Sequence, residues 1–267
     1  MIENNLELVW LNGTLVTAGE AAISVSDRGF TLGDGLFETL RLQASAPQDV
    51  PAHFARLAAG AALLRLPLPF DAARMGEILT ATAGANRLAD GGLRLTLTRG
   101  PGPRGLLPPG APEVTVLATA FSVAPVQGVR AIIARSIARD ETSPLSRLKT
   151  LNYLPNILAR LEAQDAGAEE AIMLNRAGMV AGATIGNILV RSGALWFTPP
   201  LSDGALPGIR RAKLLAAGLV REAPISTEML QNATALCVCN VLAVRPIIAL
   251  EGTALPAMAL GKAGVSE

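Results

Sequence analysis

The stretch VRAIIARSIARDETSPLSRLKTLNYLPNILARLEAQDAGAEEAIMLN (129–175) decides the fold class, because it leads from a β-rich segment through a helical one into a second β-rich segment. Residues 129–136 and 169–175 have the composition of strands, whereas residues 152–167 carry apolar side chains at helical spacing. The same alternation continues on both sides of the stretch. It predicts a mixed α and β architecture rather than a helical bundle or a β-sandwich.

The flanking segments predict further elements of both kinds. A hairpin is expected in LELVWLNGTLV (6–16), turning at Asn12 and Gly13. The remaining expected elements are a helix over 53–66, strands over 93–100 and 113–121, a hairpin over 187–200, a helix over 208–223 and strands within 233–250. The least structured junction lies near residues 118–127. We therefore expect two domains, residues 1–120 and residues 121–267.

Composition narrows the classes of function. Lys plus Arg (23) nearly balance Asp plus Glu (22) and no basic run occurs, so neither nucleic acid nor a membrane surface is the expected partner. The N-terminal MIENNLELVW has no signal-peptide pattern, and a cytoplasmic protein is expected. His53 is the only histidine, and Cys237 and Cys239 form neither a plausible disulfide nor a zinc site. Catalysis would therefore depend on lysine, tyrosine, carboxylates or a cofactor.

Three local motifs each allow two interpretations. GPGPRG (100–105) matches a dinucleotide pattern, but its prolines remove amide donors and no helix follows, which favours a loop carrying Arg99 and Arg104. Lys149 is either an ordinary surface lysine or, if it is buried, a free amine that attacks a carbonyl. The segment LPGIRRAKLL (206–215) is either a helix start that binds an anion or an ordinary proline-started helix.

Together these segments resemble the fold-type IV enzymes that use pyridoxal 5′-phosphate (PLP), namely branched-chain aminotransferases, D-amino acid aminotransferases and 4-amino-4-deoxychorismate lyases. The resemblance implies an α+β fold of two domains, a small N-terminal α/β domain and a larger C-terminal β-rich domain that binds PLP. The matching segments are ISVSDRGFTLGDGLFETLR (23–41), HFARL (53–57), TRGPGPRG (98–105), KTLNYLPNILA (149–159), EEAIMLNRAGMVAGATIGNILV (169–190) and LWFTPPLSDGALPGIRR (195–211).

The resemblance also implies a role for each matching residue. Lys149 would hold the cofactor as a Schiff base and later shuttle the proton. Arg56 would bind the cofactor phosphate together with the backbone of Ile209 and Arg210, and Tyr153 would hydrogen-bond the phenolic oxygen. The family also implies a homodimer, a small amino substrate and no metal.

One position departs from the family pattern. Gly182 stands where members usually carry the glutamate that keeps the pyridine nitrogen protonated, so the cofactor ring should be a weaker electron sink. Thr184 or a water is a possible neutral substitute, and weakened catalysis is another reading of this departure. Asn187 closes the motif that follows the cofactor-facing strand.

Within the family, FETLR (37–41), the loop RGPGPRG (99–105) and CNVLAVRPI (239–247) most resemble the lyases that form 4-aminobenzoate and pyruvate. Arg104, Arg99 and Leu32 are the expected substrate-binding residues, since a guanidinium offers paired donors to a carboxylate. A D-amino acid or branched-chain aminotransferase is the alternative.

Overall fold

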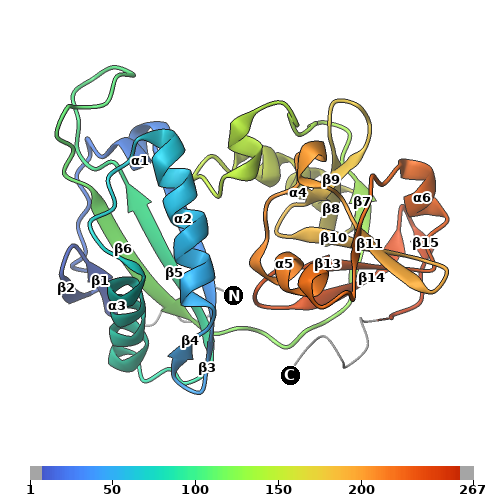
Figure 1. The fold of residues 1–267 in the computed structure, drawn as a ribbon, viewed down its shortest axis with the longest axis horizontal. Helices are drawn as coiled ribbons and strands as arrows, with labels where there is room; N and C mark the ends of the chain where they lie inside the picture. Colours follow the sequence, from blue (N-terminus) through green and yellow to red (C-terminus); the bar gives the residue numbers. More distant parts are fainter. Residues whose placement is uncertain (1–7, 259–267) are drawn as a thin grey trace. The chain divides into compact units, whose positions relative to one another are not determined.

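The computed structural model describes residues 8–258, which divide into two compact units. Unit 1 comprises the chain up to Ala124 together with Lys149–Asn152, and unit 2 comprises Pro125–Leu148 and the chain from Tyr153 onward. Figure 1 shows the helices and strands of both units. The expected α+β fold with two domains is confirmed. The sequence placed Lys149–Asn152 in the second domain, however, whereas in the structure this segment belongs to unit 1.

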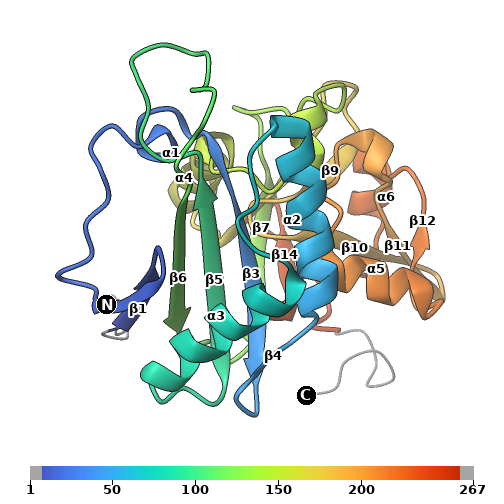
Figure 2. The same cartoon turned by 60° about the vertical axis from the view of Figure 1, so that its left-hand side comes forward.

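Unit 1 is built on a six-stranded antiparallel sheet. Helices α2 (Val50–Leu64) and α3 (Ala72–Ala85) pack on one face of it, as Figure 2 shows, and the short helix α1 (Arg28–Leu32) precedes the third strand. The strands in spatial order are β2 (Thr14–Thr17), β1 (Leu8–Leu11), β6 (Thr115–Phe121), β5 (Gly91–Thr98), β3 (Gly35–Gln43) and β4 (Ala46–Pro47).

The core of unit 1 follows from the two-residue period of its central strands. Six of the inward-facing positions of β3 and β5, which recur at every second residue, are fully buried leucines: Leu36, Leu40, Leu42, Leu93, Leu95 and Leu97. Glu38 occupies the remaining inward position of β3 and is only 1% exposed. A carboxylate in this apolar row requires partners, because an unpaired buried charge is strongly destabilising.

Unit 2 contains a nine-stranded mixed sheet. Its strands in spatial order are β12 (Arg221–Glu222), β11 (Leu195–Thr198), β10 (Asn187–Ser192), β13 (Ala235–Cys239), β14 (Val244–Leu250), β7 (Val129–Ile133), β8 (Glu170–Leu174) and β9 (Val180–Ala183), with β15 (Thr253–Ala254) paired to β14. Its helical segments are η1 (Pro144–Arg147), α4 (Leu154–Asp165), η2 (Leu201–Asp203), α5 (Ile209–Ala216) and α6 (Thr227–Gln231). The three neighbouring strands β14, β7 and β8 run parallel to one another.

Most of the expected elements are present. The turn at Asn12 and Gly13 joins β1 to β2, although Leu6 and Glu7 of the expected hairpin lie outside the described residues. Cys237 and Cys239 lie on β13 within one hydrophobic cluster, and neither forms a disulfide bond.

Two expectations about local structure were incomplete or wrong. The helix predicted over 208–223 ends at Ala216, because Gly218 takes a left-handed φ of 69° and the chain turns into β12. Helix α3 was not among the elements predicted from local sequence patterns.

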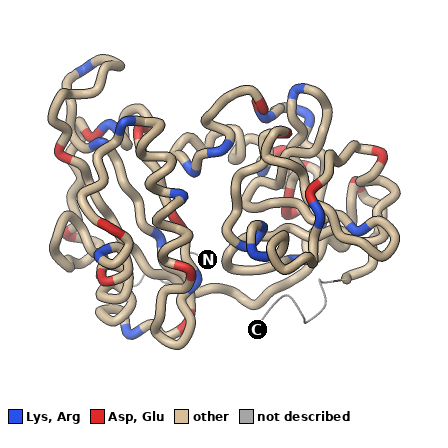
Figure 3. The backbone as a smooth tube through the Cα atoms, viewed as in Figure 1, with Lys and Arg blue, Asp and Glu red and all other residues tan. Residues whose placement is uncertain are grey.

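Charges of both signs are distributed along both units, as Figure 3 shows. In residues 8–258, no helix has the length and apolar composition needed to cross a bilayer. Over the same range, no group of three or more His, Cys, Asp or Glu side chains is arranged to hold a metal ion.

Candidate active site

Lys149 is held on the free edge of β3 in unit 1. The Phe37 N–H donates to the Lys149 carbonyl (2.9 Å) and the Leu151 N–H donates to the Gly35 carbonyl (3.1 Å), so the segment extends the sheet by a few residues. Gly35 permits this approach, since a Cβ there would lie 2.5 Å from a backbone oxygen and 2.8 Å from the Leu151 side chain. These long-range hydrogen bonds explain why Lys149 belongs to unit 1.

The Lys149 side chain is half-buried against an aromatic ring. Its Nζ lies 4.1 Å from the centroid of the Phe37 ring, and the guanidinium carbon of Arg94 lies 3.7 Å from the same centroid. The Phe37 ring therefore meets a cation from each of the two segments that flank β3. Sequence reasoning missed Arg94, because only the register of β5 on β3 places it near Phe37.

Arg56 of α2 is joined to the buried carboxylate of Glu38. Its Nε and Nη2 donate to the two carboxylate oxygens at 2.8 and 2.5 Å, and His53 Nδ1 lies 2.6 Å from Oε2. Burial would raise the pKa of Glu38, but the hydrogen bonds and charges of Arg56 and His53 outweigh it and hold that pKa below its usual value. The shared helix face of His53 and Arg56 is confirmed, with Glu38 as the partner that the sequence did not identify.

Arg99 has a buried structural setting. Its guanidinium donates to both oxygens of Asp34 (2.7 and 3.1 Å) and to the carbonyls of Arg65 and Leu64 (2.9 and 2.8 Å). The second arginine bound to Asp34 is Arg28. Four donated hydrogen bonds thus hold the Arg99 guanidinium in place within unit 1, and its expected role in substrate binding stays a prediction.

The loop GPGPRG (100–105) is confirmed as a loop, and no helix follows it. Arg28 anchors it by donating to the carbonyls of Gly105 (2.9 Å) and Leu106 (2.8 Å). Arg104 is exposed within this loop, and Leu32 is 44% exposed at the end of α1. Both side chains are therefore accessible from solvent in unit 1.

In unit 2 the start of α5 has the features of an anion site. Gly208 is its N-cap, and the N–H groups of Ile209 and Arg210 have no acceptor among the described residues. Asn187 fixes the preceding turn by donating to the carbonyl of Leu206 (2.9 Å). A Cβ on Gly208 would lie 2.1 Å from Asn187 Oδ1, so a larger residue there would displace the Asn187 amide. Free N–H groups at a helix start suit a phosphate.

Gly182 lies in β9, where the surrounding structure leaves space for a side chain. Its φ lies outside the left-handed region, and an added Cβ would meet only the carbonyl oxygen of Gly186, at 3.2 Å. The nearby Thr184 is buried and donates both its N–H (3.0 Å) and its hydroxyl to the carboxylate of Glu170. Because that hydroxyl proton is already used, Thr184 can act toward another group only as an acceptor.

Glu170 is a second buried carboxylate that sequence reasoning missed. It is 1% exposed and faces Arg160, whose Nη1 lies 3.3 Å away. Tyr153, the remaining expected residue, is half-buried at the N-cap of α4. Asn156, in the first turn of that helix, donates to the carbonyl of Thr184 (2.7 Å). The first turn of α4 and the end of β9 are thereby joined within unit 2.

The expected site residues thus form two groups, one in each unit. A single known protein family matches the part of the sequence that contains most of both groups. The family described as amino-transferase class IV matches residues 35–250. The chain belongs to the class IV aminotransferase family. The match covers Arg56, Lys149, Gly182 and the start of α5, and it identifies the protein as a PLP-dependent enzyme.

Individual class IV relatives have different activities. A putative branched-chain-amino-acid aminotransferase of Methanocaldococcus jannaschii is 31% identical over 91% of this chain and 88% of its own length. A D-alanine aminotransferase of Bacillus licheniformis is 31% identical, over 95% and 92%. The crystal structure of the 4-amino-4-deoxychorismate lyase of Pseudomonas aeruginosa has a TM-score of 0.80 and 32% identity, and the match covers 95% of each chain.

The residues present fit the cofactor of the class IV family. The half-buried Lys149 supplies an amine for a covalent bond to the PLP aldehyde carbon. The N–H groups of Ile209 and Arg210 at the start of α5, which have no acceptor among the described residues, suit the phosphate. No carboxylate is supplied at position 182 for the ring nitrogen, which is the one point where the fit is incomplete.

Proposed function

We propose that this class IV enzyme is a lyase that converts 4-amino-4-deoxychorismate to 4-aminobenzoate and pyruvate. The observation that carries the proposal is Gly182, which offers no acidic partner to the cofactor ring. PLP, when bound, withdraws electrons from the substrate carbon that bears the amine, and it does so best when its ring nitrogen is protonated. In the lyase reaction aromatisation of the product supplies driving force, so a weaker electron sink is less damaging than in transamination.

The proposed role of Lys149 is to attach the cofactor and to act as the base. Its Nζ, once free, would take the proton from the ring carbon that carries the amine. The bond between the ring and the enolpyruvyl oxygen would then break, the ring would become aromatic, and the enolpyruvate released would take up a proton to give pyruvate. The contact with Phe37 supports this role, because it keeps one side of the amine away from water.

Each unit supplies proposed cofactor contacts of its own. In unit 1, Arg56 is proposed to bind the phosphate. In unit 2, the N–H groups of Ile209 and Arg210 are proposed to bind the phosphate, and Tyr153 is proposed to hydrogen-bond the phenolic oxygen. Within unit 2, Asn187 holds the turn before α5 in place. Thr184 holds the end of β9 through Glu170, and Gly182 lies on that strand.

The proposed substrate contacts lie in unit 1. Arg104 offers a solvent-accessible guanidinium for a substrate carboxylate. Leu32, which belongs to the matching segment 23–41, offers an exposed apolar side chain. Arg99 contributes indirectly, by fixing Asp34 and the carbonyls of residues 64 and 65.

The second candidate function is transamination of a D-amino acid or a branched-chain amino acid. It is favoured by the names of the Bacillus licheniformis and Methanocaldococcus jannaschii relatives. A PLP-binding protein with weakened catalysis is a third reading of Gly182.

The deciding experiment supplies enzymatically made aminodeoxychorismate and follows the fluorescence of 4-aminobenzoate without any keto acid. A parallel panel contains D- and L-amino acids with pyruvate or 2-oxoglutarate. The lyase predicts 4-aminobenzoate without a keto-acid partner. Transamination without 4-aminobenzoate would reject the lyase in favour of the second candidate, and a cofactor absorbance band without turnover would favour the third.

We also propose that the enzyme is a homodimer, as the family resemblance implies. Supporting this, one face of α4 exposes apolar side chains at helical spacing, Leu154, Ile157, Leu158 and Leu161. Sedimentation equilibrium measures the state directly, and a monomer mass at micromolar concentration would contradict the proposal.

A further inference from the structure

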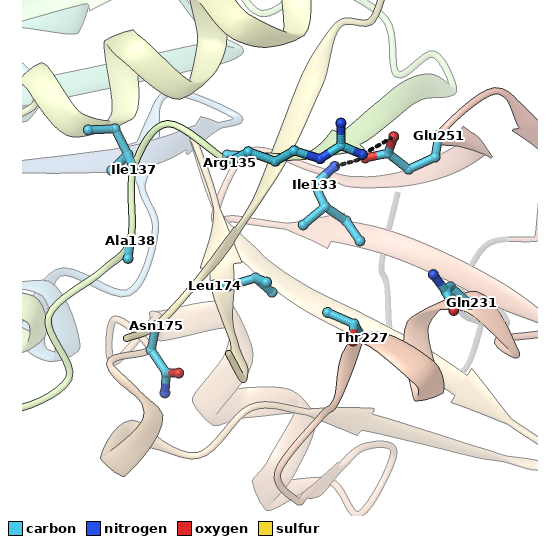
Figure 4. Close-up of a pocket in the computed structure, with 10 residues that line it drawn as sticks. Ile133, Arg135, Ile137, Ala138, Leu174, Asn175, Thr227, Gln231 and Glu251 are labelled. Carbon is cyan, nitrogen blue, oxygen red and sulfur yellow. Dashed lines mark hydrogen bonds and ion pairs between the residues drawn. The ribbon is translucent and has the colours of Figure 1, made fainter. Parts of the chain in front are cut away.

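A hollow of about 490 Å³ lies in unit 2, among residues to which no role has been assigned above. Figure 4 shows the side chains that surround it. Its volume lies in the range of roughly 300–1,000 Å³ that is typical of small-molecule sites. Most of the surrounding surface is apolar, and Ile133, Ile137 and Leu174 contribute the larger apolar side chains.

The hollow lies where three neighbouring parallel strands end. Glu251 follows the last residue of β14, Arg135 follows β7 by two residues, and Asn175 follows β8. The carboxyl ends of parallel strands are where open α/β sheets generally bind ligands. Thr184 binds Glu170 at the opposite end of β8, which spans roughly 13 Å at about 3.3 Å per residue. None of the lining residues belongs to the candidate active site, although Gly182 pairs with Met173, the neighbour of the lining residue Leu174.

An exposed ion pair lies at the edge of the hollow. Arg135 Nη2 lies 3.3 Å from Glu251 Oε2, and the side chains are 78% and 35% exposed. Glu251 is held in place, because its Oε1 accepts from the Ile133 N–H at 2.7 Å. The Arg135 side chain, in contrast, is mostly exposed, and its charge also acts on Glu162. An exposed pair of this kind contributes little to stability. A ligand that satisfies both charges can therefore separate the pair at little cost.

The other polar groups of the hollow are available as well. The side chains of Thr227 and Gln231 form no hydrogen bond with another described residue, and both belong to α6. An apolar floor beside one cationic and one anionic group complements a zwitterion with an aliphatic body.

We propose that this hollow binds an α-amino acid with an aliphatic side chain. The ligand carboxylate replaces Glu251 on Arg135, and its ammonium binds the anchored carboxylate of Glu251. Its side chain packs on Ile133 and Leu174. No bond is made or broken in this step, and the inference does not depend on the proposed lyase activity.

The test is titration calorimetry with L-leucine on holoenzyme whose cofactor has been reduced onto its lysine with borohydride, so that the amino acid cannot react there. We expect a dissociation constant on the order of 1 mM. Two analogues that each lack one charge, 4-methylpentanoate and 3-methylbutylamine, should bind at least tenfold more weakly.

Variants locate the binding. Arg135→Gln and Glu251→Gln should each weaken L-leucine binding at least fivefold, and the latter keeps an acceptor for the Ile133 N–H. The matched control is Glu169→Gln, which removes the carboxylate of another exposed pair, with Arg130, at the opposite end of β7 and β8. Its affinity should be unchanged. The proposal is overturned if wild type gives no binding heat, if both analogues bind as well as L-leucine, or if the two hollow variants bind as wild type does.

Discussion

Replacing Glu38 by glutamine should have two effects that can be measured separately. It should lower the stability of unit 1, and it should weaken binding of the cofactor phosphate. Glu38 and His53 are each 1% exposed, and the Arg56 side chain is 10% exposed. Removing one partner of such a buried pair costs about 3–5 kcal/mol, because the other charge stays buried without its counter-charge. The free energy of unfolding, measured by urea titration, should fall by about that amount.

Cofactor binding provides the more specific readout. Glu38 orients Arg56 through two hydrogen bonds, so Glu38→Gln should release the guanidinium from its fixed direction. A charge-assisted hydrogen bond is worth about 1.5–3 kcal/mol, which corresponds to roughly a 10- to 150-fold loss of PLP affinity. Pyridoxal, which lacks the phosphate, should lose almost no affinity. The measurement is equilibrium binding of both compounds to the apoenzyme.

Asp34→Asn is the matched control, because Asp34 also holds two buried arginines but makes no contact with Arg56. It should lower stability while leaving the ratio of PLP affinity to pyridoxal affinity unchanged. Equal loss of both affinities in Glu38→Gln, or an equal change of the ratio in the control, would refute the role of Glu38 in orienting Arg56.

The pKa of Glu38 adds a pH dependence with a definite sign. Because the folded-state pKa lies below the ordinary value of 4.5, the carboxylate contributes stability above pH 4.5. That contribution is lost as the pH falls through the folded-state pKa. Wild type should therefore lose more stability than Glu38→Gln on acidification below about pH 4.5.

Three further predictions test individual residues. Lys149→Ala should abolish the cofactor absorbance band and nearly all turnover. Peptide mass spectrometry after borohydride reduction of wild type should find the phosphopyridoxyl group on Lys149. A label on Lys213 would overturn the assignment. Gly182→Glu should fold, since an added Cβ meets only the Gly186 oxygen at 3.2 Å. At unchanged cofactor content it should accelerate any step limited by electron withdrawal into the cofactor ring. A fully loaded variant with no kinetic gain would count against a rate limited by that withdrawal. Burial raises the pKa of the Cys239 thiol to about 12, so it should resist thiol reagents at pH 8 until the protein unfolds, and rapid labelling of the native enzyme would contradict this.

Local sequence patterns determined much of the secondary structure. The turn at Asn12 and Gly13, the helix that carries His53 and Arg56, and the strand with both cysteines depend on contacts between residues close in the chain. The spacing of apolar residues and the residue types in turns therefore predict these elements directly. The motif around Lys149 likewise singled out one lysine among several, because its neighbours match a family pattern.

The tertiary structure decided which groups these residues meet. Glu38 is the partner of Arg56 because α2 packs on β3, and Arg94 lies by Phe37 because β5 pairs with β3 in one register. Lys149 belongs to unit 1 through hydrogen bonds to residues more than a hundred positions earlier, beyond the reach of any local pattern. Arg99 similarly forms an ion pair with Asp34. The fold brings these two side chains within hydrogen-bonding distance, and their spacing in the sequence alone does not specify that distance.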